Sequence, residues 1–180
     1  MQRTITNPLI KDQVTFLTTS RESSGTRTEV EVLLAHGGGT PMHYHITFAE
    51  TFIVTRGKLG LEAGGRKFYL LPAERFTVPP GMKHRFFNDS EEDLIFRVLI
   101  EPGSEGFENS LRIAYGLATD GRTNSRSVPR NVYHLAYLTA IGDSNLAGGL
   151  ALLGPFFRFL ARRAVHRKID VALLRRYCRD

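Results

Sequence analysis

Apolar and polar residues alternate along much of the first half of the chain. Within residues 26–35, Val30, Val32 and Leu34 stand at every second position, and Glu29 and Glu31 alternate with the valines. A period of two predicts a β-strand with one buried and one solvent-facing side. Short segments of this kind are also expected at 13–19, 59–63, 67–71, 75–78, 84–88 and 94–100, with turns rich in Gly and Pro between them. Many short, regularly spaced strands are typical of a mainly β sandwich or barrel.

The pattern changes after residue 102, where apolar residues begin to recur every three or four positions. This spacing predicts helices at 106–119 and from residue 131 to 141. Pro155 suits the first turn of a further helix. From there an apolar stripe runs through Phe157, Leu160, Ala164, Val165, Ile169, Leu173 and Tyr177. We therefore expect a β-domain at 1–102 and a helical extension at 103–180 that ends in one basic amphipathic helix, and we expect helix 106–119 to cap the barrel.

The net charge of +6 comes from the second part of the chain. Residues 1–120 carry 13 basic and 15 acidic side chains, whereas residues 121–180 carry 11 basic and 3 acidic ones. Two interpretations of the basic helix stay open: its apolar stripe packs on the barrel or on a second subunit, or the helix binds an anionic membrane surface. We expect no nucleic-acid partner, because no recognition helix-turn-helix or stacking platform is present.

Two features indicate a cytoplasmic location. Residues 1–10 lack the apolar core of a signal peptide, and Cys178 is the only cysteine, so no internal disulfide forms. The segment 146–161 is the most apolar of the chain, but it holds three glycines, a proline and Arg158. It is too short and interrupted for a transmembrane helix. Peripheral membrane attachment through the basic helix is the alternative kept above.

Four side chains form a candidate metal site. His43 and His45 are two positions apart, so on a strand both imidazoles point to the same side. Glu50 follows at an odd spacing, and we expect a bend or bulge between residues 47 and 49 to bring its carboxylate to the same place. His84 follows a Pro-Pro-Gly turn and opens another strand. Three imidazoles and one carboxylate suit a divalent Fe, Mn, Ni, Cu, Co or Zn ion without selecting one.

The spacing of these residues resembles that of the cupin superfamily, in particular its small single-domain bacterial members. The pattern G-x5-H-x-H-x4-E-x6-G is matched by Gly37, His43, His45, Glu50 and Gly57. The pattern G-x5-P-x-G-x2-H-x3-N is matched by Pro79, Gly81, His84 and Asn88, with Ala73 in place of its first glycine. The resemblance implies a double-stranded β-helix, or jelly-roll barrel, with one metal bound inside. It also implies a homodimer.

The side chains expected around the metal are mainly apolar. Parity along the strands places five residues on the inner face as a candidate substrate pocket: Phe52, Val54, Phe86, Phe96 and Val98. Acid or base candidates other than Glu50 are scarce there, so Glu50 is the candidate catalytic residue. A dioxygenase-like oxidoreductase that acts on a small apolar or aromatic substrate is the leading hypothesis. A metal-dependent isomerase and a non-catalytic protein that binds or senses a small ligand are the alternatives.

Overall fold

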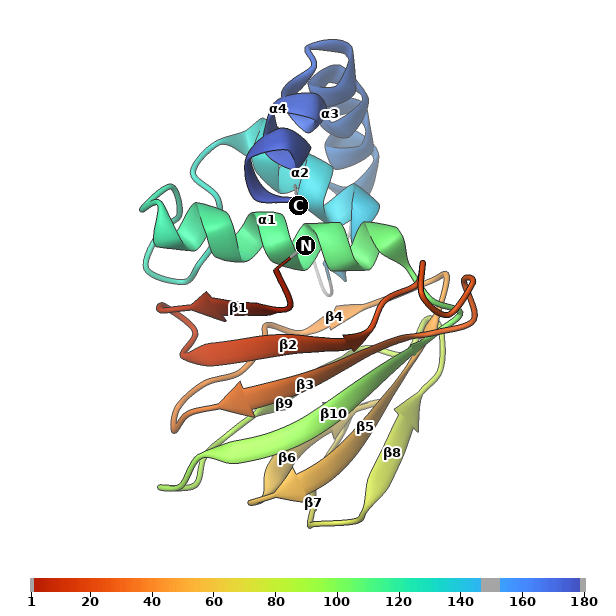
Figure 1. The fold of residues 1–180 in the computed structure, drawn as a ribbon, viewed down its shortest axis with the longest axis vertical. Helices are drawn as coiled ribbons and strands as arrows, with labels where there is room; N and C mark the ends of the chain where they lie inside the picture. Colours follow the sequence, from red (N-terminus) through yellow and green to blue (C-terminus); the bar gives the residue numbers. More distant parts are fainter. Residues whose placement is uncertain (1, 147–152, 179–180) are drawn as a thin grey trace.

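The computed structural model describes residues 2–146 and 153–178 and contains two antiparallel β-sheets beneath a group of helices (Figure 1). The six-stranded sheet has the order β1 (Thr4–Asn7), β2 (Asp12–Thr18), β3 (Thr28–Leu34), β10 (Leu94–Glu101), β5 (Ala49–Arg56) and β8 (Arg75–Val78). The five-stranded sheet has the order β11 (Asn145–Leu146), β4 (His43–Tyr44), β9 (His84–Phe87), β6 (Leu59–Ala63) and β7 (Arg66–Leu70). The expected mainly β jelly-roll architecture with C-terminal helices is confirmed.

The register of β3 against β10 shows how the alternating pattern builds the core. Val30 pairs with Val98, and Val32 pairs with Phe96. All four side chains are buried. The positions between them face outward, where an ion pair joins Arg97 to β3. Each strand therefore buries one side against the other sheet, and the buried apolar surface drives the two sheets together.

Two turn positions take a backbone conformation that favours glycine. Gly57, the last residue of the first motif, has φ of 86°, and a Cβ there would lie 3.2 Å from the Cα of Leu94. Ala73 replaces the glycine that begins the second motif, and it has φ of 70°. Its N–H still donates to the carbonyl of Val54 at 3.0 Å. The turn therefore keeps the glycine-like geometry, at a cost of roughly 1–2 kcal/mol for a residue with a Cβ.

The structure adds two strands that the sequence pattern did not predict. Residues 1–10 were expected to form only a polar N-terminal segment, but β1 pairs with β2 at the edge of the six-stranded sheet. Strand β11 comes from the helical extension and pairs with β4 in the other sheet. A strand from residues 145–146 therefore lies beside His43, which ties the extension to the barrel.

Helices α1 (Glu105–Thr119) and α2 (Val132–Ile141) confirm the helices expected at 106–119 and 131–141. Ser104 and Asn131 cap them, since each side chain accepts a hydrogen bond from a backbone N–H of the first turn. Helix α1 lies across the end of the barrel beside β1 and β2 (Figure 1). Its buried Phe107 and Tyr115 pack in the core of the barrel, which confirms the expectation that it caps the barrel. Its buried Ile113 and Leu117 pack against the other helices.

The prediction of one continuous basic helix is wrong. Helix α3 (Gly154–His166) ends where Lys168 takes a left-handed conformation with φ of 57°, and α4 (Ile169–Tyr177) begins there. Leu160 and Ala164 are buried on α3, and Leu173 is buried on α4. The break lets α3 pack on α2 while α4 packs on α1, so each half of the apolar stripe buries part of its residues against another helix, while Val165 stays exposed. No glycine or proline marks the break in the sequence.

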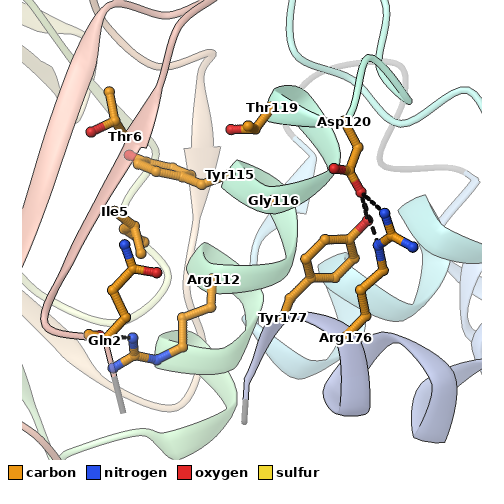
Figure 2. Close-up of a pocket in the computed structure, with 10 residues that line it drawn as sticks. All are labelled: Gln2, Ile5, Thr6, Arg112, Tyr115, Gly116, Thr119, Asp120, Arg176 and Tyr177. Atoms are coloured by element: carbon orange, nitrogen blue, oxygen red, sulfur yellow. Dashed lines mark hydrogen bonds and ion pairs between the residues drawn. The ribbon is translucent and has the colours of Figure 1, made fainter. Parts of the chain in front are cut away.

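The C-terminal end of α4 is held to α1 by polar contacts. Figure 2 shows Arg176 and Tyr177 directed at Asp120, the residue that ends α1. The hydroxyl of Tyr177 donates to Asp120 at 2.6 Å, and the guanidinium of Arg176 contacts the same carboxylate at 2.7 Å. These contacts hold the end of α4 against the end of α1.

No helix within residues 2–146 and 153–178 is long and apolar enough to cross a membrane. Of the apolar segment 146–161, residues 147–152 lie outside the described part of the chain. The expected homodimer, cytoplasmic location and peripheral membrane contact stay predictions. Apolar Phe156, Phe159 and Val165 are exposed on α3.

Candidate metal centre

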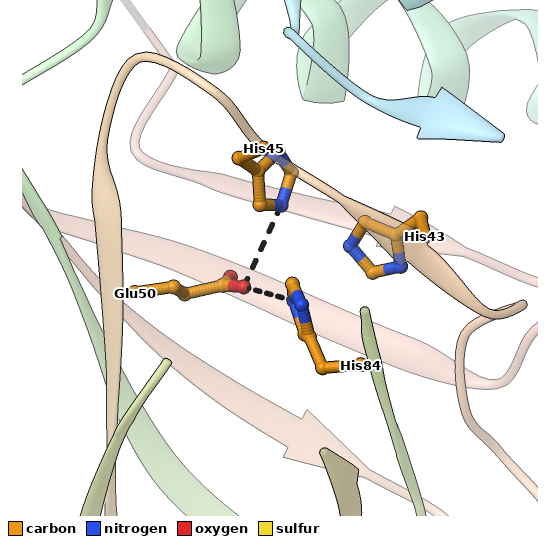
Figure 3. A group of neighbouring side chains, drawn as sticks. All are labelled: His43, His45, Glu50 and His84. Atoms are coloured by element: carbon orange, nitrogen blue, oxygen red, sulfur yellow. Dashed lines mark hydrogen bonds and ion pairs between the residues drawn. The ribbon is translucent and has the colours of Figure 1, made fainter. Parts of the chain in front are cut away.

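The four candidate ligands come together inside the barrel (Figure 3). One ligand atom from each of His43, His45, Glu50 and His84 lies within 4.8 Å of the others. His43 and His84 face each other across the β4–β9 pair. Glu50 comes from β5 in the opposite sheet. The site is therefore formed between the two sheets, with donors from both.

A bend between the two sheets brings Glu50 to the histidines. After His45 the chain bends at Ile46 and Thr47 and leaves the five-stranded sheet, and it enters the six-stranded sheet at Ala49. The bend expected before Glu50 is confirmed. It changes sheets rather than bulging one strand, and for this reason an odd spacing still aims both side chains at one point.

Backbone carbonyls fix the orientation of all three imidazoles. The Nδ1 of His43 lies 2.8 Å from the carbonyl oxygen of Pro41. The Nδ1 atoms of His45 and His84 each lie 3.0 Å from a carbonyl, of Asp143 and Met82 respectively. A carbonyl only accepts, so each Nδ1 carries a proton and donates it, which leaves the lone pair of a neutral ring on Nε2. Histidine metal ligands are held in this way by hydrogen bonds from the other ring nitrogen.

The charges at the site compensate one another. Burial acts to raise the pKa of Glu50, but its contacts with His45 and His84 are stronger together and lower it below the ordinary value. Burial lowers the pKa of His84, whereas its 2.7 Å hydrogen bond with Glu50 and the charge of Glu50 raise it above the ordinary value. Burial and the charge of His84 lower the pKa of His43 to about 4, so this ring is neutral at pH 7.

These residues fit a divalent metal ion. The Nε2 of His45 is buried and has no hydrogen-bond partner within the part of the chain that the structure describes, since the nearest oxygen of Glu50 is 3.6 Å away. A buried nitrogen without a partner is unfavourable unless something binds it. A cation would bind this nitrogen and take the place of the proton between Glu50 and His84. Three imidazoles and a carboxylate are donors that divalent transition metals accept.

A cavity of about 330 Å³ adjoins the site. His43, His45 and Glu50 line it directly. Of the five residues predicted for the substrate pocket, Phe86 and Val98 line it. The other three, Phe52, Val54 and Phe96, are buried in the core and are not among the lining residues. They support the wall from behind, and Phe52 and Phe96 lie within 6.2 Å of the Phe86 ring, centroid to centroid.

The helical extension supplies a large part of the cavity wall. Helix α1 contributes Phe107, Leu111 and Tyr115, and the loop between α1 and α2 contributes residues 126–129. The Asn7 side chain donates to the hydroxyl of Ser127 at 2.8 Å and so holds this loop over the cavity. Sequence reasoning treated the loop only as a polar linker. It therefore missed a wall that only the folded chain brings together.

Asp143 supports the metal ligands from the extension, and sequence reasoning missed it. Its carboxylate accepts hydrogen bonds from the backbone N–H groups of Ile46 and Thr47, both at 2.6 Å, and from the Thr47 hydroxyl at 2.9 Å. Its carbonyl holds His45. Burial acts to raise the pKa of Asp143, but these hydrogen bonds lower it. One residue thus fixes the bend and a ligand ring. Nothing in its local sequence points to the barrel.

Few acids or bases other than Glu50 were expected on the inner face, and two that sequence reasoning missed lie there. Asp12 and Tyr115 line the same cavity, and the Tyr115 hydroxyl donates to the Oδ2 of Asp12. Burial raises the pKa of Asp12 to about 6, although the hydrogen bond from Tyr115 acts to lower it. The strand was expected to begin at Gln13. Asp12 has the same parity as inward-facing Val14, so a strand one residue longer would have found it.

Comparisons with known proteins agree with this architecture. Residues 30–101 match the family model of the cupin domain. No curated protein matches the chain. An RmlC-like cupin from Shewanella frigidimarina is 19% identical, with 59% of this chain and 89% of that chain covered and a TM-score of 0.51. KdgF from Halomonas sp. is 21% identical, with 53% and 82% covered and a TM-score of 0.48. Similarity at this level shows the fold alone.

Proposed function

Residues 30–101 belong to the cupin superfamily, and we propose that the chain is a metal-dependent oxidoreductase of the dioxygenase kind. Its substrate in this proposal is a small molecule that is mainly apolar or aromatic. His43, His45, Glu50 and His84 hold one divalent ion of Fe, Mn, Ni, Cu, Co or Zn. The observation that carries the proposal is that all three rings donate from Nδ1 to a backbone carbonyl, which leaves each Nε2 for a metal.

A metal held by these four side chains would supply the activation of dioxygen and of an oxygen of the substrate. A dioxygenase transfers both atoms of dioxygen to its substrate, so the reaction needs no separate reductant. The chain orients the reactants and excludes water, since apolar Val30, Val98 and Leu111 line the cavity beside the ligands. Glu50 serves as a ligand and as the acceptor of a substrate proton.

Elemental analysis and oxygen uptake test this function. The protein, purified without a polyhistidine tag, is expected to hold about one equivalent of a redox-active metal and to consume dioxygen with at least one compound of an aromatic panel. Glu50→Gln should lower the rate at least tenfold. The matched control is His36→Ala, because His36 is exposed and only contacts the carbonyl of Ser90.

Other outcomes of the same measurements contradict parts of the proposal. Full activity of Glu50→Gln would exclude the proton-acceptor role. A metal-loaded protein that binds ligands but consumes neither them nor dioxygen would be a binding or sensing protein. Conversion of a ligand without consumption of dioxygen would indicate an isomerase. Failure to bind any metal after reloading would overturn the proposal as a whole.

A further inference from the structure

Asp12 is a buried acidic residue of the cavity that the proposed metal site does not use. It begins β2, and its side chain lies on the inward-facing row that continues with Val14 and Phe16. The residue is only 5% exposed, and it lines the cavity. Ionisable side chains are rarely buried without a partner of opposite charge. The position of this carboxyl therefore asks for a specific explanation.

The two oxygens of Asp12 differ in their surroundings. The hydroxyl of Tyr115 donates to Oδ2. Burial, followed by the charge of Asp12, raises the pKa of Tyr115 well above its ordinary value, so this hydroxyl remains protonated. The other oxygen, Oδ1, is buried and has no hydrogen-bond partner among residues 2–146 and 153–178. A structural link between α1 and the sheet needs only Oδ2, so this role leaves Oδ1 without an explanation.

The neighbouring Asn7 provides an internal contrast. It pairs with Asp12 in the β1–β2 register, it is also buried, and it lines the same cavity. Its Oδ1 accepts from the backbone N–H groups of Leu9 and Ile10, and its amide donates to Ser127. Every polar atom of Asn7 is thus engaged in holding the fold. In Asp12, by contrast, Oδ1 is left to accept a hydrogen bond from a molecule in the cavity.

Asp12 lies at the opposite end of the cavity from the metal ligands. The ring of Phe107 is 6.4 Å from that of His45, centroid to centroid, near the start of α1. Tyr115, which contacts Asp12, is eight residues further along the helix, and this corresponds to about 12 Å. Along β3, Asp12 pairs with Leu34, whereas Glu50 is level with Thr28, six residues away. A molecule that reaches from the metal ligands to Asp12 is therefore elongated.

We propose that Asp12, oriented by Tyr115, is a binding subsite for a hydroxyl or amino group at the end of the substrate remote from the metal. The inference rests on the proposed function, because the other end of the substrate binds the metal. The substrate class is then an elongated, mainly apolar molecule with a metal-binding oxygen at one end and a hydrogen-bond donor at the other. Asp12 Oδ1 accepts from that donor, while the apolar wall between the ends contacts the skeleton.

Two naphthoic acids test the subsite. 6-Amino-2-naphthoic acid carries a carboxylate for the metal and a donor at the far end, and 2-naphthoic acid lacks only the amino group. Titration calorimetry of the zinc-loaded protein should give about tenfold tighter binding of the amino compound. In Asp12→Asn the ratio should fall to about one, because the amide accepts from Tyr115 and turns its NH2 group toward the ligand. Affinity for 2-naphthoic acid should stay within about twofold of the wild-type value.

Each other result decides against a particular claim. An equal preference for the amino compound in wild-type protein and in Asp12→Asn would overturn the subsite. Binding of neither compound to zinc-loaded protein would overturn the stated substrate class. Failure of zinc to bind at all would overturn the proposed function. The zinc titration comes first, so a failure of the proposed function is distinguished from a failure of the subsite. Asp12→Asn conserves side-chain volume, and circular dichroism confirms its fold before any titration.

Discussion

The cavity is lined by two buried carboxyl groups, Glu50 and Asp12, whose pKa values are shifted in opposite directions. Glu50 lies among imidazoles, and its contacts with His45 and His84 outweigh burial and lower its pKa. Burial raises the pKa of Asp12 to about 6, although hydrogen bonds from the neutral hydroxyl of Tyr115 and from its own backbone N–H act to lower it. Equal burial therefore gives opposite shifts, and the neighbours decide the direction. The surroundings of Glu50 suit a cation, and Asp12 has an oxygen that can accept a hydrogen bond from a neutral donor.

The largest expected effect is on metal binding, when one of the four ligands is removed. His84→Ala removes a ligand and also the ring that lies 2.7 Å from Glu50. We expect the metal content to fall from about one equivalent to background, a loss of more than 100-fold in affinity, since a lost ligand exceeds the effect of a lost supporting contact. Elemental analysis after dialysis measures it. Retention of stoichiometric metal would show that the ion binds elsewhere, and His36→Ala should keep its metal.

The next largest effect concerns Asp12 and is seen in the free energy of unfolding. A pKa of about 6 in the folded protein, against an ordinary 3.8, means that the folded state holds the Asp12 proton more tightly than the unfolded state does. Stability is then lost as the pH rises from about 4 to above 6. The advantage of Asp12→Asn over wild-type protein should grow by roughly 3 kcal/mol over this range. The titratable groups that face Asp12 are Tyr115 from α1 and Arg126 from the loop that lines the cavity.

Urea unfolding of both proteins at pH 4 and at pH 7.5 measures this difference. Other titrating groups occur in both proteins and cancel in the comparison. An advantage that does not depend on pH would show that Asp12 has an ordinary pKa, and the contrast between the two carboxylates would then be lost. A variant that is more stable yet binds the amino probe less tightly would sharpen the contrast.

The smallest expected effect is on metal affinity when Asp143, which holds the bend and the His45 ring, is changed. Asp143→Ala removes the acceptor of the N–H groups in the bend before Glu50 and loosens the carbonyl that holds His45. Loss of such a supporting contact typically weakens metal binding 10- to 100-fold. We expect about tenfold by zinc titration, and a smaller loss in Asp143→Asn, which keeps one acceptor. Unchanged affinity in both variants would mean that the barrel alone orients His45.

The sequence was informative about the barrel because its signals are local. The spacing of His43, His45, Glu50 and His84 sufficed to predict a site that the fold assembles from both sheets. Alternation found the strands to within two residues, apart from the short β1, β4 and β11. These interactions lie within or between neighbouring segments, where a period of two or a fixed spacing reports them directly.

The missed features depend on contacts between distant parts of the chain. Asp143 acts on His45 across 98 residues, and no local pattern records that contact. The break at Lys168 follows from the packing of α3 and α4 on other helices, and no helix-breaking residue announces it. Asp12 was missed for a smaller reason, because the expected strand began one residue too late. Its pairing with Tyr115 required the position of α1, which the sequence did not supply.

The contact between Asp143 and His45 also has a consequence for biosynthesis. His45 is synthesised 98 residues before the carbonyl that orients its ring. At ordinary elongation rates this interval is about 5–20 s. Strand β11, which pairs with β4, follows Asp143 directly in the chain. A nascent chain therefore carries an incompletely held set of ligands until residues 143–146 have been made, even where the barrel has already folded.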